Sequence, residues 1–320
     1  MKNVAFTMAE ILLSLTIIGV VAAITLPSLT GNINERTWNT QRKALYARMS
    51  QAIALMPSLN GYGTLTEDES GSIEDTAAET FITDGLSKVL KINNICDSEH
   101  LADCGISSKI TTLTASQIDF PKTMSELCPA MTSVSGSQWD GTPYSHDALD
   151  TKAAAFETQN GESLALYYNP KCVANMNENQ TYMMQTKICA HFIFDLNGSK
   201  GPNTMNKDIG IMTVIYPTDS VVAAPYVANK NASSQSVVYS EMQKQCIAFD
   251  SEYRVPNKYE LMSMFISQNL IGNLSNGYRS SEISVNKLNY SHHAWRFLIS
   301  TGNVTSTAKT DAWPVRCVKR

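Results

Sequence analysis

The chain has 320 residues, of which 17% are charged, and its formal net charge is −4. A nucleic-acid-binding protein normally carries a basic surface, so this charge argues against such a partner. All seven cysteines follow residue 95, and none forms a CxxC or Cys/His metal pattern, which favours an exported chain with disulfide bonds over a cytosolic one.

An apolar stretch at residues 6–29 follows a short leader, Met1–Ala5, that carries one lysine. No charged residue occurs between Ile11 and Asn34, and about 20 apolar residues suffice to cross the hydrocarbon core of a bilayer. The sequence therefore predicts a membrane-spanning helix with Glu10 inside its N-terminal end. A carboxylate at the centre of a membrane helix costs about 2.5–3.5 kcal/mol, so we expect Glu10 to have a functional partner.

Three interpretations of this stretch compete. In a secretory signal peptide, Val21-Ala22-Ala23 would form the cleavage site, but Glu10 interrupts the apolar region. A plain membrane anchor leaves Glu10 unexplained. In the third interpretation the signature lies nearer the N-terminus: Phe6-Thr7-Met8-Ala9-Glu10 after a short basic leader resembles the prepilin signature of type IV pilins and type II secretion pseudopilins.

The prepilin resemblance implies cleavage between Ala5 and Phe6 by a prepilin peptidase, followed by methylation of the new N-terminus at Phe6. The family usually has glycine before the cut, where this chain has Ala5. In a filament, the Phe6 ammonium of one subunit would meet Glu10 of a neighbour in an apolar core, where the pair sets the register of assembly. Pro27 lacks a backbone donor, so we expect a kink or local unwinding near residues 23–27.

Beyond the apolar stretch, the helix is expected to continue to about residue 56. Its outer half has one apolar face, formed by Leu45, Met49, Ile53 and Met56. The opposite side carries the basic residues Arg36, Arg42, Lys43 and Arg48. Residues 6–56 are therefore predicted to form a transmembrane and amphipathic stem, whose apolar face packs on a globular head at residues 57–216.

The predicted head contains one helix and several strands. An amphipathic helix is expected at residues 76–91, whereas residues 131–159 show no regular pattern. Strands are expected at residues 163–168, 187–196 and 209–216. Asn-Gly between the last two strands favours a hairpin.

The turn that starts at Asp195 contains the string Asp195-Leu196-Asn197-Gly198-Ser199-Lys200-Gly201-Pro202-Asn203. It resembles a D-x-NG-x-KGPN turn that recurs in the head domains of pilin-like proteins. A calcium loop is the alternative, with Asp195, Asn197 and Asp208 as ligands. This loop lacks the spacing and the terminal glutamate of an EF-hand.

The cysteines of the head suggest two disulfides. Cys96 and Cys104 bracket a short loop, and Cys172 and Cys189 lie on or beside predicted strands. If six of the seven cysteines pair, one remains, and Cys128 is the candidate by elimination.

Residues 217–236 have the composition of a linker, and a second unit of the chain is expected at residues 237–320. This unit begins with a predicted helix at residues 237–249. Asn257 and Glu260 then fit a helix capping box.

The second unit also contains, in order, RVPN-x-x-EL, GYRSSE, AWRF with a later glycine, and VRCV. These pieces are similar to the Fibrobacter-type major paralogous domain, which has a C-type-lectin-like fold. The resemblance implies a disulfide between Cys246 and Cys317, and Arg279 stands where the domain has tryptophan. No Glu-Pro-Asn or Trp-Asn-Asp string of a sugar-binding lectin occurs, so sugar binding is not inherited from the fold.

The chain shows no motif of a hydrolase, a metalloprotease or a nucleotide-binding enzyme, so no enzymatic activity, cofactor or metal site is predicted. The adjacent pair His292-His293 could bind a metal, but neighbouring side chains on a strand face opposite ways, so a surface or partly packed role is favoured.

Together these features predict an α+β fold: a long N-terminal membrane-spanning helix packed on a pilin-like antiparallel-sheet head, followed by a small lectin-like α+β domain. The predicted function is a minor pilin or pseudopilin, low in copy number or at the tip of a type IV pilus or type II secretion pseudopilus. Its expected partners are prepilin peptidase, other pilin or pseudopilin subunits, the inner-membrane assembly platform and an unidentified surface ligand.

The predicted location is the bacterial inner membrane, crossed once, with the bulk of the chain periplasmic or extracellular and, after assembly, in a cell-surface filament. A major pilin is the alternative within this class. From a different class, a membrane-anchored or secreted surface-binding protein would use residues 6–29 only as anchor or signal.

Overall fold

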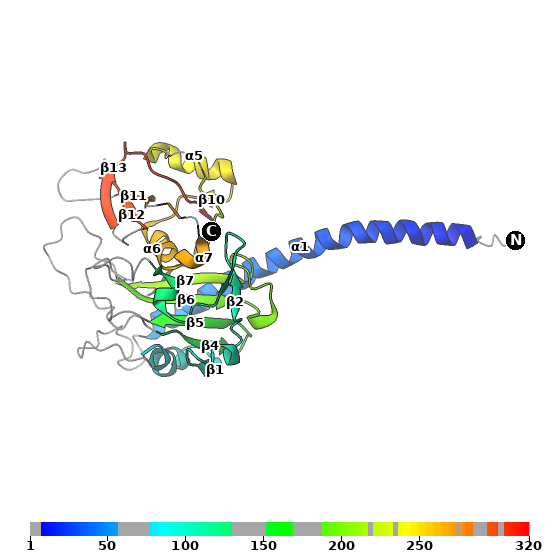
Figure 1. Ribbon diagram of the computed structural model, residues 1–320, viewed down its shortest axis with the longest axis horizontal. Coiled ribbons are helices and arrows are strands. Elements are labelled where there is room, and N and C mark those ends of the chain that lie inside the picture. Colours follow the sequence, from blue (N-terminus) through cyan, green and yellow to red (C-terminus); the bar gives the residue numbers. More distant parts are fainter. Residues whose placement is uncertain are drawn as a thin grey trace. The chain divides into compact units, whose positions relative to one another are not determined.

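The computed structural model describes residues 8–56, 77–129, 152–168, 187–216, 220–232, 236–272, 274–275, 277–283, 293–299 and 304–319. The chain forms two compact units, Met1–Ala44 and Leu45–Arg320. The first unit holds most of helix α1 (Met8–Leu55), and the second holds the end of α1 and all the other described elements (Figure 1).

Helix α1 is a single helix of 48 residues. It follows the predicted stem, apart from its first residues, which lie outside the described part of the chain. Helix α1 is continuous through Pro27, so the local unwinding expected near residues 23–27 does not occur. Loss of the one hydrogen bond that the proline cannot donate does not break the helix.

The predicted membrane-spanning helix is not seen, which corrects the expected fold class. Among the helices of the described residues, none is both long and apolar enough to cross a membrane. The described structure is an α+β fold with several antiparallel sheets.

The end of α1 packs on the second unit as predicted. The stripe Leu45, Met49, Ile53 and Met56 is fully buried. The helix expected at residues 76–91 is present as three short pieces, α2 (Ala77–Thr80), a π-helical turn (Phe81–Gly85) and a 3₁₀ turn (Leu86–Lys88).

The main sheet of the second unit has six antiparallel strands in the order β1-β4-β5-β6-β7-β8. Their bounds are β1 (Ile92–Cys96), β4 (Ala154–Thr158), β5 (Ser163–Tyr168), β6 (Lys187–Asp195), β7 (Ile209–Tyr216) and β8 (Ser220–Ala223). β5, β6 and β7 confirm the predicted strands, and β6 and β7 form the predicted hairpin. β4 lies in a region that was expected to be irregular. The strand was not predicted because its buried alanines and Phe156 do not alternate with polar residues.

Smaller elements surround this sheet. A 3₁₀ turn (Leu101–Cys104), strands β2 (Lys109–Thr111) and β3 (Gln117–Asp119) and helix α3 (Met124–Leu127) follow β1. A 3₁₀ turn (Gly198–Lys200) lies between β6 and β7.

The C-terminal region forms two three-stranded sheets, β10-β14-β9 and β11-β12-β13. Its strands are β9 (Tyr226–Val227), β10 (Tyr253–Arg254), β11 (Gly277–Ile283), β12 (His293–Leu298), β13 (Val304–Ala308) and β14 (Val318–Lys319). Its helices are α5 (Tyr239–Phe249), α6 (Lys258–Ile266) and α7 (Gln268–Ile271). The predicted capping box of α6 is present: the Asn257 side chain accepts from the Glu260 backbone N–H, and the Glu260 carboxylate accepts from that of Asn257.

Helix α6 contacts the main sheet at β7 and β8 and the C-terminal sheet at β11 and β12 (Figure 1). All seven of its residues from Glu260 to Ile266 are buried, and one hydrophobic cluster extends from Cys96 to Val318. The segment that was expected to be a linker contributes β8 to the main sheet and β9 to a C-terminal sheet. Helix α6 thus belongs to a hydrophobic cluster that includes both sheets, whereas Cys246 and Cys317 lie in a second cluster with α5.

The described residues contain two disulfides, Cys96–Cys104 and Cys246–Cys317, as expected from the spacing of the first pair and the resemblance behind the second. Cys128 is a buried thiol that donates to the carbonyl oxygen of Phe265 at 3.3 Å. The predicted Cys172–Cys189 pair lies outside the described part of the chain, since Cys172 is not described.

Candidate functional site

Four predicted residues of processing and assembly lie at the start of the chain. Ala5 and Phe6 fall outside the described residues. Glu10 and Pro27 lie in α1, where the backbone is described and their side chains are not. Cleavage, methylation and the Phe6–Glu10 pair therefore stay predictions.

The described side chains in the first turns of α1 are mostly apolar and exposed. Side chains on every side of the helix are more than half exposed: Met8, Leu12, Leu13, Leu15, Ile17, Ile18, Val20 and Val21. The polar side chain of Thr16 adds little polarity, because its hydroxyl donates to the carbonyl oxygen of Leu12 at 2.7 Å. Exposed apolar surface on this scale marks a surface that another molecule covers.

The other end of α1 is fixed to the second unit by charge as well as by packing. Arg48 forms a two-pronged ion pair with Glu162, in which Nη1 lies 3.3 Å from Oε2 and Nη2 contacts Oε1. Glu162 is 5% exposed and also accepts from the hydroxyl of Thr158 in the turn between β4 and β5. Such a planar pair sets both distance and orientation, so the end of the helix is held in a defined register.

A buried polar network joins the main sheet to the C-terminal region. His191 on β6 is fully buried, with Nδ1 2.9 Å from the Thr213 hydroxyl and Nε2 2.9 Å from the Ser267 hydroxyl. Thr213 donates to Ser263 on α6 at 2.7 Å. These contacts fit a neutral imidazole with its proton on Nδ1, and burial lowers the pKa of His191 to about 3.

The turn between β6 and β7 is rich in oxygen atoms that accept no hydrogen bond. Asp208 is satisfied, because its two oxygens accept from the backbone N–H groups of Asn203 and Thr204 at 2.8 Å. Asp195 Oδ2, Asn197 Oδ1 and Asn203 Oδ1 are buried without a partner. Burial, with the nearby charge of Asp208, raises the pKa of Asp195 to about 7.

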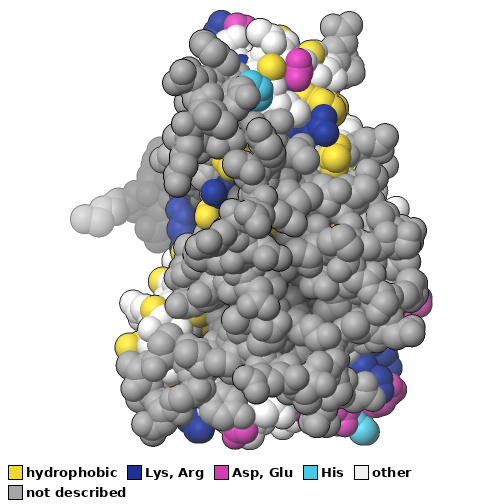
Figure 2. Space-filling view, turned by 90° about the vertical axis from the view of Figure 1, so that its left-hand side faces the viewer, with side chains coloured by type: hydrophobic (Ala, Val, Ile, Leu, Met, Phe, Trp, Pro, Cys, Tyr) yellow, Lys and Arg dark blue, Asp and Glu magenta, His cyan; other side chains and the backbone are white. Residues whose placement is uncertain are grey.

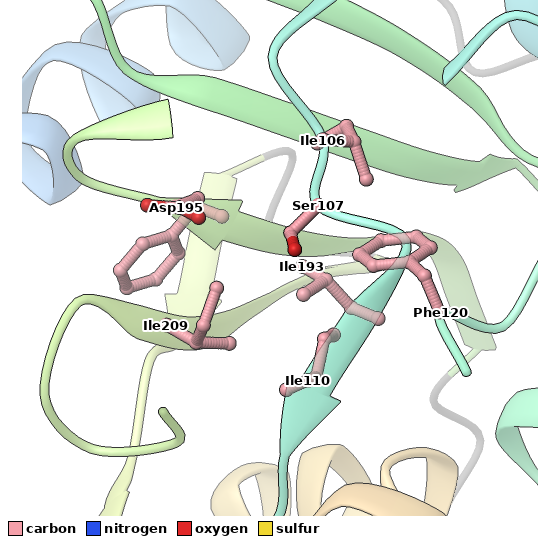
Figure 3. Close-up of a pocket in the computed structure, with 8 residues that line it drawn as sticks. Ile106, Ser107, Ile110, Phe120, Ile193, Asp195 and Ile209 are labelled. Atoms are coloured by element: carbon pink, nitrogen blue, oxygen red, sulfur yellow. The ribbon is translucent and has the colours of Figure 1, made fainter. Parts of the chain in front are cut away.

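A narrow pocket lies beside this turn, between the β6–β7 hairpin and the segment around β2 (Figure 3). Its lining is mostly apolar and consists of Ile106, Ser107, Ile110, Phe120, Ile193, Phe194, Asp195 and Ile209. Asp195 and Phe120 lie at opposite ends of it. Ser107 accepts from the side-chain amide of Asn203 at 3.0 Å, so its hydroxyl belongs to the support of the turn.

The calcium alternative for this turn has oxygen atoms of the kind that Ca²⁺ prefers, but few charges. Only two carboxylates contribute, Asp195 and Asp208. Among the described residues, no group of three or more His, Cys, Asp or Glu side chains is placed to hold a metal ion.

Replacing Asp195 by asparagine separates the two interpretations of the turn. The folded chain prefers the protonated carboxyl, so its stability falls as pH rises from 3.8 through about 7. In EDTA at pH 8 we expect Asp195→Asn to raise the free energy of unfolding by about 1–3 kcal/mol in urea denaturation. A lower free energy of unfolding for Asp195→Asn than for the wild-type chain in EDTA would contradict the expectation that the ionised carboxyl destabilises the fold. If the turn binds calcium, millimolar Ca²⁺ will reverse the order of the two proteins.

Comparison with the models of known protein families gives no match. No curated protein matches the sequence either.

Sequence reasoning missed the contacts that hold the stem and join the sheets. It placed Arg48 on the polar side of the stem, whereas the structure pairs it with a residue 114 positions away. It did not separate His191 from the other histidines. The available signal was weak: His191 is a polar residue at the centre of an apolar strand, and such a residue needs buried partners.

Proposed function

We propose that this chain is a minor pilin or pseudopilin, a low-copy subunit that joins a helical filament through its N-terminal helix. One observation carries the proposal: α1 is a single helix whose first turns expose apolar side chains on every side, while its last turns are buried in a folded unit. A subunit that packs its N-terminal helix against those of its neighbours requires this division of one helix.

In the proposed assembly, the surface from Met8 to Val21 is covered by the helices of other pilin or pseudopilin subunits. Burial of such side chains contributes about 25 cal/mol for each Å² removed from water, without fixing the axial register. The register comes from charge: the Phe6 ammonium of one subunit pairs with Glu10 of the next. The Arg48–Glu162 pair and the buried stripe then transmit this register to the folded unit.

The proposal includes processing and location. A prepilin peptidase cuts after Ala5, and the chain waits at the bacterial inner membrane, with its folded unit in the periplasm, until the assembly platform adds it to a filament. The two disulfides support an oxidising compartment for residues 45–320. The C-terminal region, with its own sheets, is larger than packing of α1 requires, and this supports a low-copy, tip-located and adhesive role over that of a major pilin.

Substitution of Glu10 tests the assembly step. We expect Glu10→Ala and Glu10→Leu to reduce incorporation into filaments at least about tenfold, because an uncompensated buried ammonium costs about 3–5 kcal/mol. Incorporation is measured by immunoblotting of sheared filaments, and the cellular level of the protein is measured in parallel. Glu35→Ala is the matched control, since it removes an exposed acid from the same helix.

Filaments that incorporate Glu10→Leu and Glu35→Ala equally would exclude the register role of Glu10. An equal loss in both variants would also count against it, because any change of charge on α1 would then be harmful.

A further inference from the structure

Two arginines stand directly opposite each other in the C-terminal sheet. Arg279 on β11 pairs in register with Arg296 on β12. Arg279 is only 1% exposed, and Arg296 is half-buried. Like charges at directly opposed positions of neighbouring strands repel, so this pair needs a source of stabilisation.

Among the described residues, neither guanidinium has an ion-pair partner. Arg279 Nη2 donates to two neutral oxygens of β13, the hydroxyl of Thr307 at 2.7 Å and the carbonyl of Ala308 at 2.6 Å. Its Nε and Nη1 atoms are buried and donate to no atom of the described residues, and the same holds for Nε of Arg296. A buried charged donor without an acceptor costs more than a neutral one, which makes this arrangement unfavourable for the chain by itself.

Trp313 adds a fourth unpartnered donor next to the arginines. The Arg296 guanidinium carbon lies 4.3 Å from the centroid of the Trp313 ring, a cation–π contact. The indole Nε1–H of Trp313 is buried and, like the arginine atoms, has no acceptor in the part of the chain that the structure describes. All four unpartnered groups are donors, so the missing partner is an acceptor with several oxygens.

The electrostatics of this face favour an anion. Burial lowers the pKa of both guanidinium groups, and the charge of Asp311 opposes that effect without a direct contact. Asp311 is exposed and Arg296, Thr307 and Trp313 are half-buried, so the cluster reaches the surface. At the height of α5 and β11–β13, Figure 2 shows both basic and acidic side chains among hydrophobic ones.

We infer that the β11–β13 sheet binds a small oxyanion, a carboxylate, sulfate or phosphate group, between Arg279, Arg296 and Trp313. The Nε–H and Nη1–H groups of Arg279, the Nε–H of Arg296 and the indole N–H of Trp313 are the donors that such a group would accept from. The site does not depend on filament assembly.

The test uses the full-length chain in mild detergent, titrated by calorimetry at constant ionic strength in chloride buffer. The probes are sodium sulfate, sodium phosphate and sodium glucuronate. We expect saturable binding of at least one of them. Tighter binding of glucuronate would point to a sugar carboxylate as the natural ligand, and tighter binding of sulfate or phosphate would point to a free or esterified oxyanion.

Three variants locate the site without touching the most buried arginine. Arg296→Gln should weaken binding at least about tenfold, and Trp313→Phe, which keeps the ring but removes the N–H, about threefold. Asp311→Asn should tighten binding, because it removes a nearby negative charge. Thermal unfolding in chloride checks that each variant is folded.

No saturable binding of any probe to the wild-type chain would overturn the inference. Equal affinity in folded Arg296→Gln, Trp313→Phe and wild-type chains would overturn it as well, because the anion would then bind elsewhere.

Discussion

Removing the Cys246–Cys317 disulfide is expected to lower the free energy of unfolding by about 4 kcal/mol. The bond closes a loop with a sequence separation of 71 residues, and in the chain-entropy model the loss grows with loop length. Alanine is the replacement of choice, since both sulfurs are fully buried in a cluster with Met242 and Val315. Urea denaturation of the double variant measures the change.

The second disulfide provides the matched control. Cys96–Cys104 has a separation of eight residues, so its double alanine variant should lose only about 2.5 kcal/mol in the same model. Equal losses in the two variants would mean that packing, rather than the constraint on the unfolded chain, determines the contribution of the longer loop.

Acid should destabilise the protein through His191. The imidazole has a pKa of about 3 in the folded chain and an ordinary value of 6.5 when unfolded. Between these values the unfolded chain binds a proton that the folded chain does not. The contribution of His191 is therefore complete above pH 6.5 and decreases by about 1.4 kcal/mol for each pH unit below it, or about 3 kcal/mol by pH 4.5.

Denaturation curves of the wild-type chain and His191→Gln at several pH values isolate this effect. Glutamine keeps one donor and one acceptor for Thr213 and Ser267 but does not titrate. Asp195 acts in the opposite direction, because its raised pKa makes the folded chain more stable as pH falls. The effect of Asp195 cancels in the difference between the unfolding free energies of the two proteins. If that difference is constant with pH, His191 does not control acid stability.

Local structure was largely predictable from local patterns. β5 and β7 have the predicted bounds, and the capping box of Asn257 and Glu260 is where the sequence placed it. The stripe at the end of α1 is buried as its spacing indicated. In each case the signal lies within a few residues, as alternation, helical spacing or a cap.

Structure that depends on distant partners was not predictable. β8 completes a six-stranded sheet from a segment with a linker's composition, because pairing with β7 and not its own propensity makes it a strand. The Arg48–Glu162 pair and the His191 network join segments 114 and 76 residues apart. The opposition of Arg279 and Arg296 follows from strand register, which a single sequence does not specify.

The membrane-spanning helix shows a different limit. We predicted it because no charged residue occurs between Ile11 and Asn34. No helix of the described residues is long and apolar enough to span a bilayer, so the absence of charge was not a sufficient criterion. What the structure adds is the exposed apolar surface from Met8 to Val21, which calls for a covering partner.

The mass of the N-terminal peptide of the chain, purified from cells that assemble it, tests the proposed filament role most directly. We expect the mature chain to begin at Phe6 with one methyl group on its amine. A mature chain that begins at Ile24 would contradict the proposal, because cleavage after Val21-Ala22-Ala23 removes Glu10 and the apolar surface and leaves a secreted protein.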